Sequence, residues 1–253
     1  MMSRSAERQL VRAIRLSAIV LVIALWDVAL RWGWIDPLFL ASPLDTLIHI
    51  RAVVVEAKLD IAATVTAFLV AFVTGVIFAL GIGFAISLSN YSRLVFLPVL
   101  VLGVTIPKVT LMPLFILWFG IARLPVIVFG ALSAFFPMVV NVLIAGNEVK
   151  PAQVLLARAM GLSRVQIYRK VVFPAMLPVL SSGLFYACNA AMMGVFIVEL
   201  ALDRHGMGAY VHDLAMTFRT ADMNAAVVLT AGMTVLINMA LWYIARYFGR
   251  WRN

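Results

Sequence analysis

Six stretches of this chain are long and apolar enough to cross a lipid bilayer, and no other feature constrains its fold as strongly. A helix spans the hydrocarbon core with roughly 20 apolar residues, and backbone polar groups in lipid must be satisfied within the spanning structure. The stretches lie at about Leu16–Ile35, Ile61–Leu88, Leu94–Trp118, Pro125–Ile144, Val171–Leu200 and Ala225–Phe248. The pattern therefore predicts an all-α integral membrane protein with about six transmembrane helices, in one domain over residues 16–248.

The composition supports this fold class and excludes an ordinary soluble domain. Hydrophobic residues make up 64% of the chain and charged residues 12%, and the charged share is about half that of a typical soluble domain. The mean hydropathy is +1.06. A single cysteine, Cys188, excludes an intramolecular disulfide and a cysteine-cluster metal site, so we expect it to be a small buried residue.

The third stretch contains residues that interrupt a helix. Pro98, Pro107 and Pro113 divide it, and Lys108 directly follows the second of them. Proline at such a depth is tolerated only where neighbouring protein or water satisfies the backbone groups that it frees. We therefore expect helix breaks at Pro107 and Pro113 that face the interior of the protein.

Basic residues are distributed unevenly between the two sides of the predicted spans. With the N-terminus in the cytoplasm, thirteen of the 20 Lys and Arg residues lie in cytoplasmic segments, six lie outside, and Lys108 lies within a span. Cytoplasmic connections carry the excess of basic residues in membrane proteins, so we expect both termini there, including a tail at residues 249–253. Residues 1–15 are either an amphipathic cytoplasmic helix or a plain orientation signal. The net charge of +9 then requires no nucleic acid.

The connection between the fourth and fifth spans is a basic, polar island. It contains Arg158, Arg164, Arg169 and Lys170 and enters the fifth span through Pro174 and Pro178. A plain connection needs only a few residues, whereas this one has a helix-compatible stretch, a Gly-Leu-Ser break at 161–163 and a second short helix-like piece. We expect a structured docking surface on the cytoplasmic side, followed by helix breaks at the two prolines. The alternative is an interfacial helix held by lipid headgroups.

The sequence contains no pattern typical of an enzyme site. It has no G-x-x-x-x-G-K-[ST] phosphate-binding loop, no H-E-x-x-H zinc motif and no G-x-S-x-G nucleophile motif. His49, His205 and His212 fall in outer connections. His205 and His212 are seven residues apart near Asp203 and Asp213, which leaves a metal site as an alternative to ordinary polar loop residues. We expect a protein that is not an enzyme, with no catalytic residue, cofactor or metal.

Three segments resemble the permeases of ATP-binding-cassette (ABC) importers. The basic island is similar to their E-A-A-x-x-x-G loop and the prolines after it, with matching residues at Ala157, Gly161, Pro174 and Pro178. Residues 106–120, IPKVTLMPLFILWFG, are similar to the I-P-K-x-A-x-x-P-L-x-x-x-W-F-G signature of the sulfonate/nitrate/taurine-type branch. Val198-Glu199 with residues 205–208 resembles the A-E, gap, S-G-x-G pattern of that branch.

The chain departs from the family pattern at several positions, one of which is Thr110 in place of the signature alanine. Leu155 stands where the family loop has an acidic residue, Ala67 where the branch has an arginine, and Met192 near a tryptophan position. These changes leave the expected fold unaffected. They weaken the prediction of the solute, because the family residues at or near Leu155, Ala67 and Met192 are polar or aromatic.

The resemblance implies a permease subunit of an ABC importer in the bacterial inner membrane, with the type I importer fold. Its partners would be cytoplasmic ATPase subunits that hydrolyse the ATP, a second permease subunit in a homodimer, a periplasmic solute-binding protein and membrane lipid. The coupling loop would be residues 148–170, with ATPase contacts at Leu155, Leu156, Ala157, Arg158, Gly161, Leu162, Ser163 and Arg164. The leucines and Met160 would enter a groove on the ATPase, and the two arginines would meet acidic residues.

Polar groups inside the spans are candidates for the solute path, because such groups are costly in lipid and tend to face cavities. Lys108 would attract an anionic solute or else pair structurally. Glu199 would gate the path or else pair with Arg204, and Asn189 is a third candidate. The solute is expected to be small and anionic or aromatic. A stand-alone secondary carrier is the alternative function, although the paired repeats and midplane acids common in such carriers are not evident in the sequence.

Overall fold

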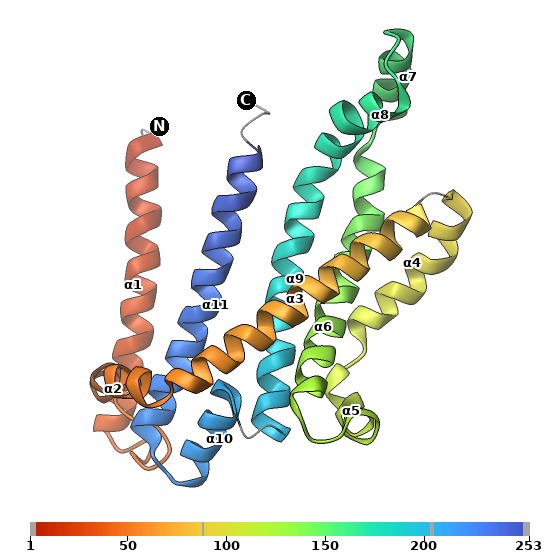
Figure 1. Ribbon diagram of the computed structural model, residues 1–253. Helices are drawn as coiled ribbons and strands as arrows, with labels where there is room; N and C mark the ends of the chain where they lie inside the picture. Colours follow the sequence, from red (N-terminus) through yellow and green to blue (C-terminus); the bar gives the residue numbers. More distant parts are fainter. Residues whose placement is uncertain (1–3, 88, 203–204, 250–253) are drawn as a thin grey trace. The chain divides into compact units, whose positions relative to one another are not determined.

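The computed structural model describes residues 4–87, 89–202 and 205–249, which fold into helices joined by short turns (Figure 1). In chain order they are α1 (Arg4–Arg31), α2 (Pro43–Glu56), α3 (Lys58–Ser87), α4 (Asn90–Thr105), η1 (Lys108–Leu111), α5 (Met112–Phe119), α6 (Arg123–Ala145), η2 (Gly146–Glu148), α7 (Pro151–Ala159), α8 (Arg164–Ile167), η3 (Tyr168–Val172), α9 (Phe173–Leu202), α10 (Met207–Met216) and α11 (Thr220–Gly249). Within the described residues, five helical runs are long and apolar enough to cross a membrane, and α4 with η1 and α5 forms a sixth, bent candidate. The predicted all-α membrane fold is confirmed.

The third span is broken at Pro107. α4 ends just before this residue, and the chain resumes in η1 after a bend of 86°. The prediction of a break at Pro113 is wrong, because Pro113 lies in the first turn of α5. The N–H that proline lacks would have no acceptor within the helix at this position. Pro98 lies inside α4 without ending it. Ile106 and Val109 are 47% and 48% exposed, so within a single chain the break does not face the interior as expected.

The chain divides into two compact units, of which the first comprises Met1–Lys58 with Tyr210–Thr230 and the second Leu59–Ala209 with Ala231–Asn253. In the first unit, α1 runs from Arg4 without interruption near residue 15. Trp26 Nε1 donates to the Ala41 carbonyl at 3.1 Å, and Ser42 Oγ caps α2 by accepting from the Asp45 amide at 3.1 Å. These bonds fix the connection between α1 and α2.

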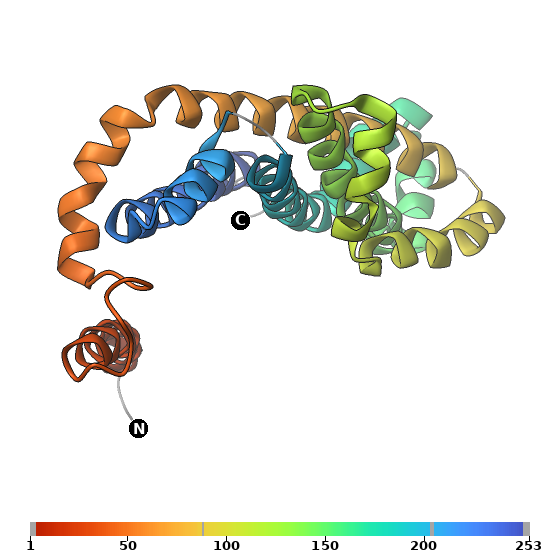
Figure 2. The same cartoon turned by 90° about the horizontal axis from the view of Figure 1, so that it is seen from below.

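The second unit has its core between α6 and α9, which lie side by side (Figures 1 and 2). Small residues allow this approach, because a Cβ at Gly130 would lie only 2.7 Å from the Val195 side chain. α3 approaches α6 in the same way, with Gly75 against the Ala131 carbonyl. Such contacts are the usual basis of helix association in membranes. Cys188 lies in this core and is fully buried, as predicted.

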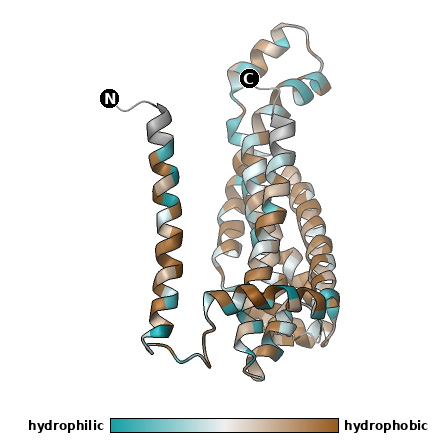
Figure 3. Cartoon of the chain, turned by 90° about the vertical axis from the view of Figure 1, so that its left-hand side faces the viewer, coloured by the Kyte–Doolittle hydropathy of each residue, from teal (hydrophilic) through white to brown (hydrophobic). Residues whose placement is uncertain are grey.

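One segment of the second unit projects beyond its long helices. α7 and α8 lie past the adjoining ends of α6 and α9, and they carry hydrophilic residues among apolar ones, whereas the spans are mainly apolar (Figures 1 and 3). Large apolar side chains stay exposed along the spans, as with Ile77 at 62% and Met193 at 66%. Apolar surfaces of this extent are normally covered by lipid or by another subunit.

Candidate functional site

The projecting segment consists of two short helices joined by a tight turn. α7 ends in a Schellman motif, in which the Gly161 amide donates to the Arg158 carbonyl at 2.9 Å and the Leu162 amide donates to the Ala157 carbonyl at 3.1 Å. The motif places one residue in the left-handed region, and Gly161 has φ +76°. No atom lies within 4 Å of a Cβ built at Gly161. Only backbone strain therefore opposes a side chain at this position.

α8 begins with a capping box. Ser163 Oγ accepts from the Gln166 amide at 3.3 Å, and Gln166 Oε1 accepts from the Ser163 amide at 2.9 Å. This reciprocal pair satisfies two amides that the start of a helix leaves free. The expected second short helix is thus present, and its start is fixed by Ser163.

The outer face of the projecting segment is apolar with basic residues beside it. Leu155, Leu156 and Met160 are 62%, 63% and 71% exposed. Arg158 and Arg164 are also exposed. This combination presents apolar side chains that a partner groove would bury, with cations at the edge.

Three residues of this segment differ from their expected roles. Ala157 is 5% exposed, so its side chain faces inward and cannot contact a partner directly. Leu162 is half-buried and offers less surface than the other leucines. Val165, which carries no distinguishing signal in the sequence, is 68% exposed and extends the apolar face onto α8.

α8 continues into α9 through one π-helical turn, η3. The Phe173 amide donates to the Tyr168 carbonyl, five residues earlier, and the helical run Arg164–Leu202 is unbroken over 39 residues. The predicted breaks at Pro174 and Pro178 are therefore wrong. A proline ring clashes with the carbonyl four residues back in a regular α-helix, and the π turn lies where Pro174 would meet that carbonyl. Pro178 then removes a single bond inside a helix that packing maintains.

Lys108 lies at the break in the third span, where its ammonium group is engaged within the chain. Its Nζ donates to the Val104 carbonyl at 3.3 Å and lies 5.7 Å from the centroid of the Phe136 ring. A cation over an aromatic face is attracted by the ring quadrupole. The same ring packs against α4 at Gly103, where any Cβ would overlap it. These contacts support the structural alternative for Lys108.

Glu199 is 1% exposed and belongs to a buried cluster at the start of α10. Thr64 Oγ1 donates to Glu199 Oε2 at 2.7 Å, and the Gly208 amide donates to the same oxygen at 3.2 Å. The Met207 amide donates to Thr64 Oγ1 at 2.8 Å. A carboxylate beside the first amides of a helix satisfies them and complements the helix dipole. The contacts support a structural role, while the expected partner Arg204 lies outside the described residues.

The glycines after Glu199 are required by this cluster. Gly206 has φ +112°, and a Cβ built there would lie 2.5 Å from Glu199 Oε1. The Gly206 amide donates to Asp60 Oδ1 at 2.8 Å. A Cβ at Gly208 would lie 2.6 Å from Glu199 Cβ. The Val198-Glu199 pair and the tetrapeptide at 205–208 therefore form one packing unit.

Asn189 lies on the exposed side of α9 and pairs with Asn238 of α11. Asn238 Nδ2 donates to Asn189 Oδ1 at 3.0 Å, and Asn189 Nδ2 lies 3.5 Å from Asn238 Oδ1. The pair borders a groove of about 380 Å³. Among the three path candidates, Asn189 is the one that lines this groove.

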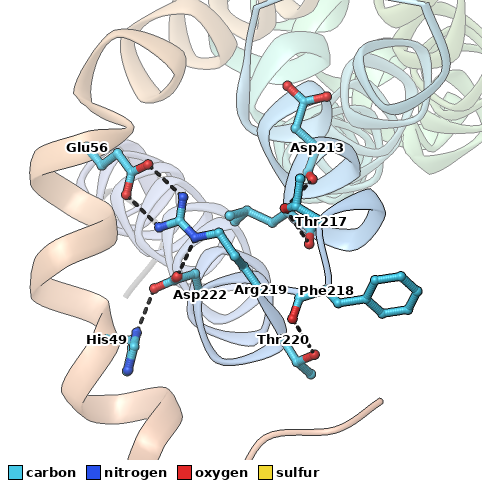
Figure 4. Close-up of polar contacts among 9 residues, drawn as sticks. His49, Glu56, Asp213, Thr217, Phe218, Arg219, Thr220 and Asp222 are labelled. Atoms are coloured by element: carbon cyan, nitrogen blue, oxygen red, sulfur yellow. Dashed lines mark hydrogen bonds and ion pairs between the residues drawn. The ribbon is translucent and has the colours of Figure 1, made fainter. Parts of the chain in front are cut away.

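A charged cluster in the first unit has no counterpart among the sequence-based predictions. Arg219 donates from both Nη atoms to the two oxygens of Glu56, each at 3.0 Å, and from Nε to Asp222 Oδ2 at 2.8 Å (Figure 4). Asp222 Oδ1 lies 2.6 Å from His49 Nδ1. These contacts tie α2 to the turn between α10 and α11. The only local signal is the three-residue spacing of Arg219 and Asp222, which permits an ion pair.

Contacts within the charged cluster shift the pKa of groups that lie outside the membrane spans. Hydrogen bonds from Arg219 hold the pKa of the Glu56 carboxyl below its ordinary value, and hydrogen bonds to Glu56 raise the pKa of the Arg219 guanidinium. Burial, followed by the charge of Glu56, raises the pKa of Tyr210 to about 12. The side chains of Arg219 and Glu56 are 45% and 47% exposed. Water and salt therefore screen this pair.

The histidines do not assemble a metal site in the described parts of the chain. Across residues 4–87, 89–202 and 205–249, no group of three or more His, Cys, Asp and Glu side chains is placed to hold a metal ion. His49 is engaged with Asp222. Asp203, part of the metal alternative raised by His205 and His212, lies outside the described residues.

Comparison with known proteins links the chain to membrane transport. The family model described as "Binding-protein-dependent transport system inner membrane component" matches residues 71–253. An aliphatic sulfonates transport permease protein of Bacillus subtilis is 27% identical over 236 residues, covering 92% of this chain and 85% of that protein. The taurine transport system permease protein of Escherichia coli is 26% identical, covering 92% and 87%. The riboflavin transport system permease protein of Chloroflexus aurantiacus is 30% identical over 154 residues, covering 61% and 58%.

Proposed function

Because this chain belongs to the binding-protein-dependent transport system inner membrane component family, we propose that its α7–α8 segment couples solute movement to a separate cytoplasmic ATPase. As an ABC-importer permease of the sulfonate/nitrate/taurine branch, the chain is a multi-pass protein of the inner membrane. Two copies enclose the path, and a periplasmic binding protein delivers a small anionic or aromatic solute. The relatives named for sulfonates, taurine and riboflavin support both solute types.

One observation carries the coupling proposal: an exposed apolar surface continues directly into a membrane span. Leu155, Leu156 and Met160 would enter a groove on the ATPase, with Arg158 and Arg164 opposite acidic residues. The Schellman turn and the capping box hold the two short helices at a fixed angle. The unbroken helix from α8 into α9 then carries movement of the ATPase towards the solute path.

The turn between α7 and α8 provides the sharpest test, through Gly161→Val. A β-branched residue in the left-handed region costs roughly 1–2 kcal/mol, so we expect about tenfold weaker retention of the ATPase and loss of ATP hydrolysis stimulated by loaded binding protein. Gly33→Val is the matched control, because Gly33 has φ +70° and a Cβ there also meets nothing within 4 Å. It carries the same backbone strain outside the segment and should couple like the parent. A Gly161→Val complex that assembles and couples normally would remove the segment from the mechanism.

A charge reversal at the edge of the segment should have a milder effect. Arg158→Glu is expected to weaken ATPase retention several-fold at low salt and much less at high salt, because exposed charges are screened. Co-purification across a salt series measures this difference. Equal retention at all salt concentrations would show that the cation does not meet the ATPase.

Reporter fusions test the orientation on which the proposal depends. A reporter after Asn253 should read cytoplasmic and one inserted near Arg204 periplasmic, because thirteen basic residues lie on one predicted side and six on the other. Opposite readings at both sites would put α7 and α8 on the outer side. Solute uptake by the purified chain alone, without an ATPase, would indicate a secondary carrier.

A further inference from the structure

Asn189 interrupts the apolar exposed face of α9 in the second unit, where it pairs with Asn238 of α11. Tyr186 and Met193 flank Asn189 at helical spacing and are 64% and 66% exposed. On the opposite face, Ala187 and Ala191 are fully buried in the core. Asn189 therefore points away from α6 and towards the groove between α9 and α11.

The hydrogen bonds of this pair leave acceptors available. Asn189 Nδ2 donates to the Phe185 carbonyl at 2.9 Å and faces Asn238 Oδ1, while Asn238 Nδ2 donates to the Thr234 carbonyl at 2.9 Å and to Asn189 Oδ1. A primary amide has two N–H donors and one oxygen with two lone pairs. All four N–H groups are thus engaged, and each oxygen can accept one more hydrogen bond.

The groove beside the pair combines amide oxygens with an aromatic surface. It has a volume of about 380 Å³ and is lined by Asn189, Thr234, Val235, Asn238, Met239 and Trp242, none of which is ionisable. Trp242 is 45% exposed, and an indole face stacks well with planar rings. Apolar walls with a few fixed polar groups are typical of small-molecule sites.

Lipid is a poor neighbour for these acceptors. A polar group transferred to hydrocarbon without a hydrogen-bond partner costs about 2–7 kcal/mol, and polar side chains within spans face cavities or the interior of a bundle. A water-filled path satisfies the two amide oxygens, and so does a solute that carries N–H groups. The exposed face around Asn189 and Asn238 is therefore suited to line the path.

We propose that this groove binds the transported solute and takes an uncharged, planar heteroaromatic group that carries N–H donors. This inference rests on the proposed transport function and selects the aromatic over the anionic solute. The N–H groups of the solute donate to the oxygens of Asn189 and Asn238, and its ring stacks on Trp242. The described residues that line the groove offer no cation to a sulfonate or nitrate, and Lys108, which bonds the Val104 carbonyl, is not among them.

Equilibrium dialysis with the permease–ATPase complex in lipid nanodiscs tests the solute class. The probes are radiolabelled uracil and nicotinamide, which are uncharged and planar with N–H donors, and benzenesulfonate, a ring of similar size with a fixed negative charge. We expect uracil and nicotinamide to compete for one site and benzenesulfonate to bind at least about tenfold more weakly. Equal or tighter binding of benzenesulfonate overturns the proposal, as does the absence of binding by both uncharged probes.

Substitutions of residues that line the groove test whether uracil binds there. Asn238→Leu and Trp242→Leu should each weaken uracil binding about tenfold. Ser182→Ala is the matched control, because Ser182 is an exposed α9 residue outside the groove whose Oγ bonds only its own helix, at the Pro178 carbonyl. It should bind uracil like the parent. Parent-like binding by Trp242→Leu overturns the assignment even if Asn238→Leu fails to fold.

The two proposals fail in different measurements. ATPase co-purification and basal ATP hydrolysis, measured on every variant, report on assembly and not on the groove. A parent chain that retains no ATPase contradicts the proposed function, and dialysis of uracil against that chain alone in nanodiscs still decides the solute class. Normal assembly with no uracil binding contradicts the groove alone.

Discussion

Two carboxylate clusters in the described parts of this protein place the same chemical group in different surroundings. Glu199 is buried, and a threonine hydroxyl and a backbone amide are among the groups that donate to it. Glu56 is nearly half exposed and accepts from the guanidinium of Arg219. Losing a partner from a buried polar group costs about 1–3 kcal/mol, whereas an exposed ion pair contributes about 0–1 kcal/mol. The buried cluster therefore defines a rigid shape, and the exposed one stabilises a turn that the solvent can weaken.

The largest effect is expected from Gly206→Ala in the buried cluster. Alanine at φ +112° is strained by about 1–3 kcal/mol, and its Cβ would also displace the Glu199 carboxylate, so we expect a total loss near 3 kcal/mol or more. Denaturant titration of the detergent-solubilised protein measures it. Gly33→Ala, strained but with open space around its Cβ, should lose only about 1 kcal/mol. Equal losses would mean that the fit around Glu199 contributes nothing.

A smaller effect is expected from Thr64→Val, which keeps the side-chain shape and removes one hydroxyl. The Glu199 carboxylate and the Met207 amide each lose a partner in a buried site, so the loss should be about 1–3 kcal/mol. Thr66→Val is the control on the same helix, because the Thr66 hydroxyl is exposed and bonds its own helix at the Ala62 carbonyl. The control should change stability by less than about 0.5 kcal/mol. Similar values for the two variants would contradict the assigned role of Thr64.

The smallest effect is expected from Glu56→Gln in the exposed cluster. The loss at neutral pH should be below about 1 kcal/mol and should shrink in 1 M salt. Arg219 lowers the pKa of Glu56, so the ion pair stabilises the fold above the ordinary pKa of a glutamate and is lost as the pH falls through the lowered value. Parent and variant should therefore converge in acid. A difference in unfolding midpoint that persists in acid or in salt would assign Glu56 a packing role instead.

Local signals in the sequence predicted most of the fold. The six spans follow from runs of apolar residues, and the turn at Gly161 follows from a glycine between two helix-compatible stretches. The turn after α10 has the same Schellman bonds, yet its left-handed residue is Phe218 at φ +54°. No glycine marks that turn in the sequence. Arg219 directly follows it and bonds Glu56, 163 residues away in the chain, a contact that no local pattern reveals.

The candidate site was predicted less completely, because burial depends on contacts distant in sequence. Local patterns located the exposed leucines of α7 but not the inward orientation of Ala157. Proline spacing identified Pro174 and Pro178, but their effect on the helix depends on the π turn before them. No residue type in the sequence predicts that turn. Asn189 was identified as an amide in an apolar span. Its partner Asn238 lies 49 residues later in the chain, on α11, and no local pattern connects the two.

The unbroken helix from Arg164 to Leu202 has a mechanical consequence. At 1.5 Å per residue, its 39 residues measure about 58 Å along the axis, nearly twice the thickness of the hydrocarbon core. In the proposed coupling mechanism, a helical run of this length that moves as one body turns a rotation of about 5° around one end into a displacement of about 5 Å at the other. A small rotation at α8 would then move the far end by roughly the width of a solute.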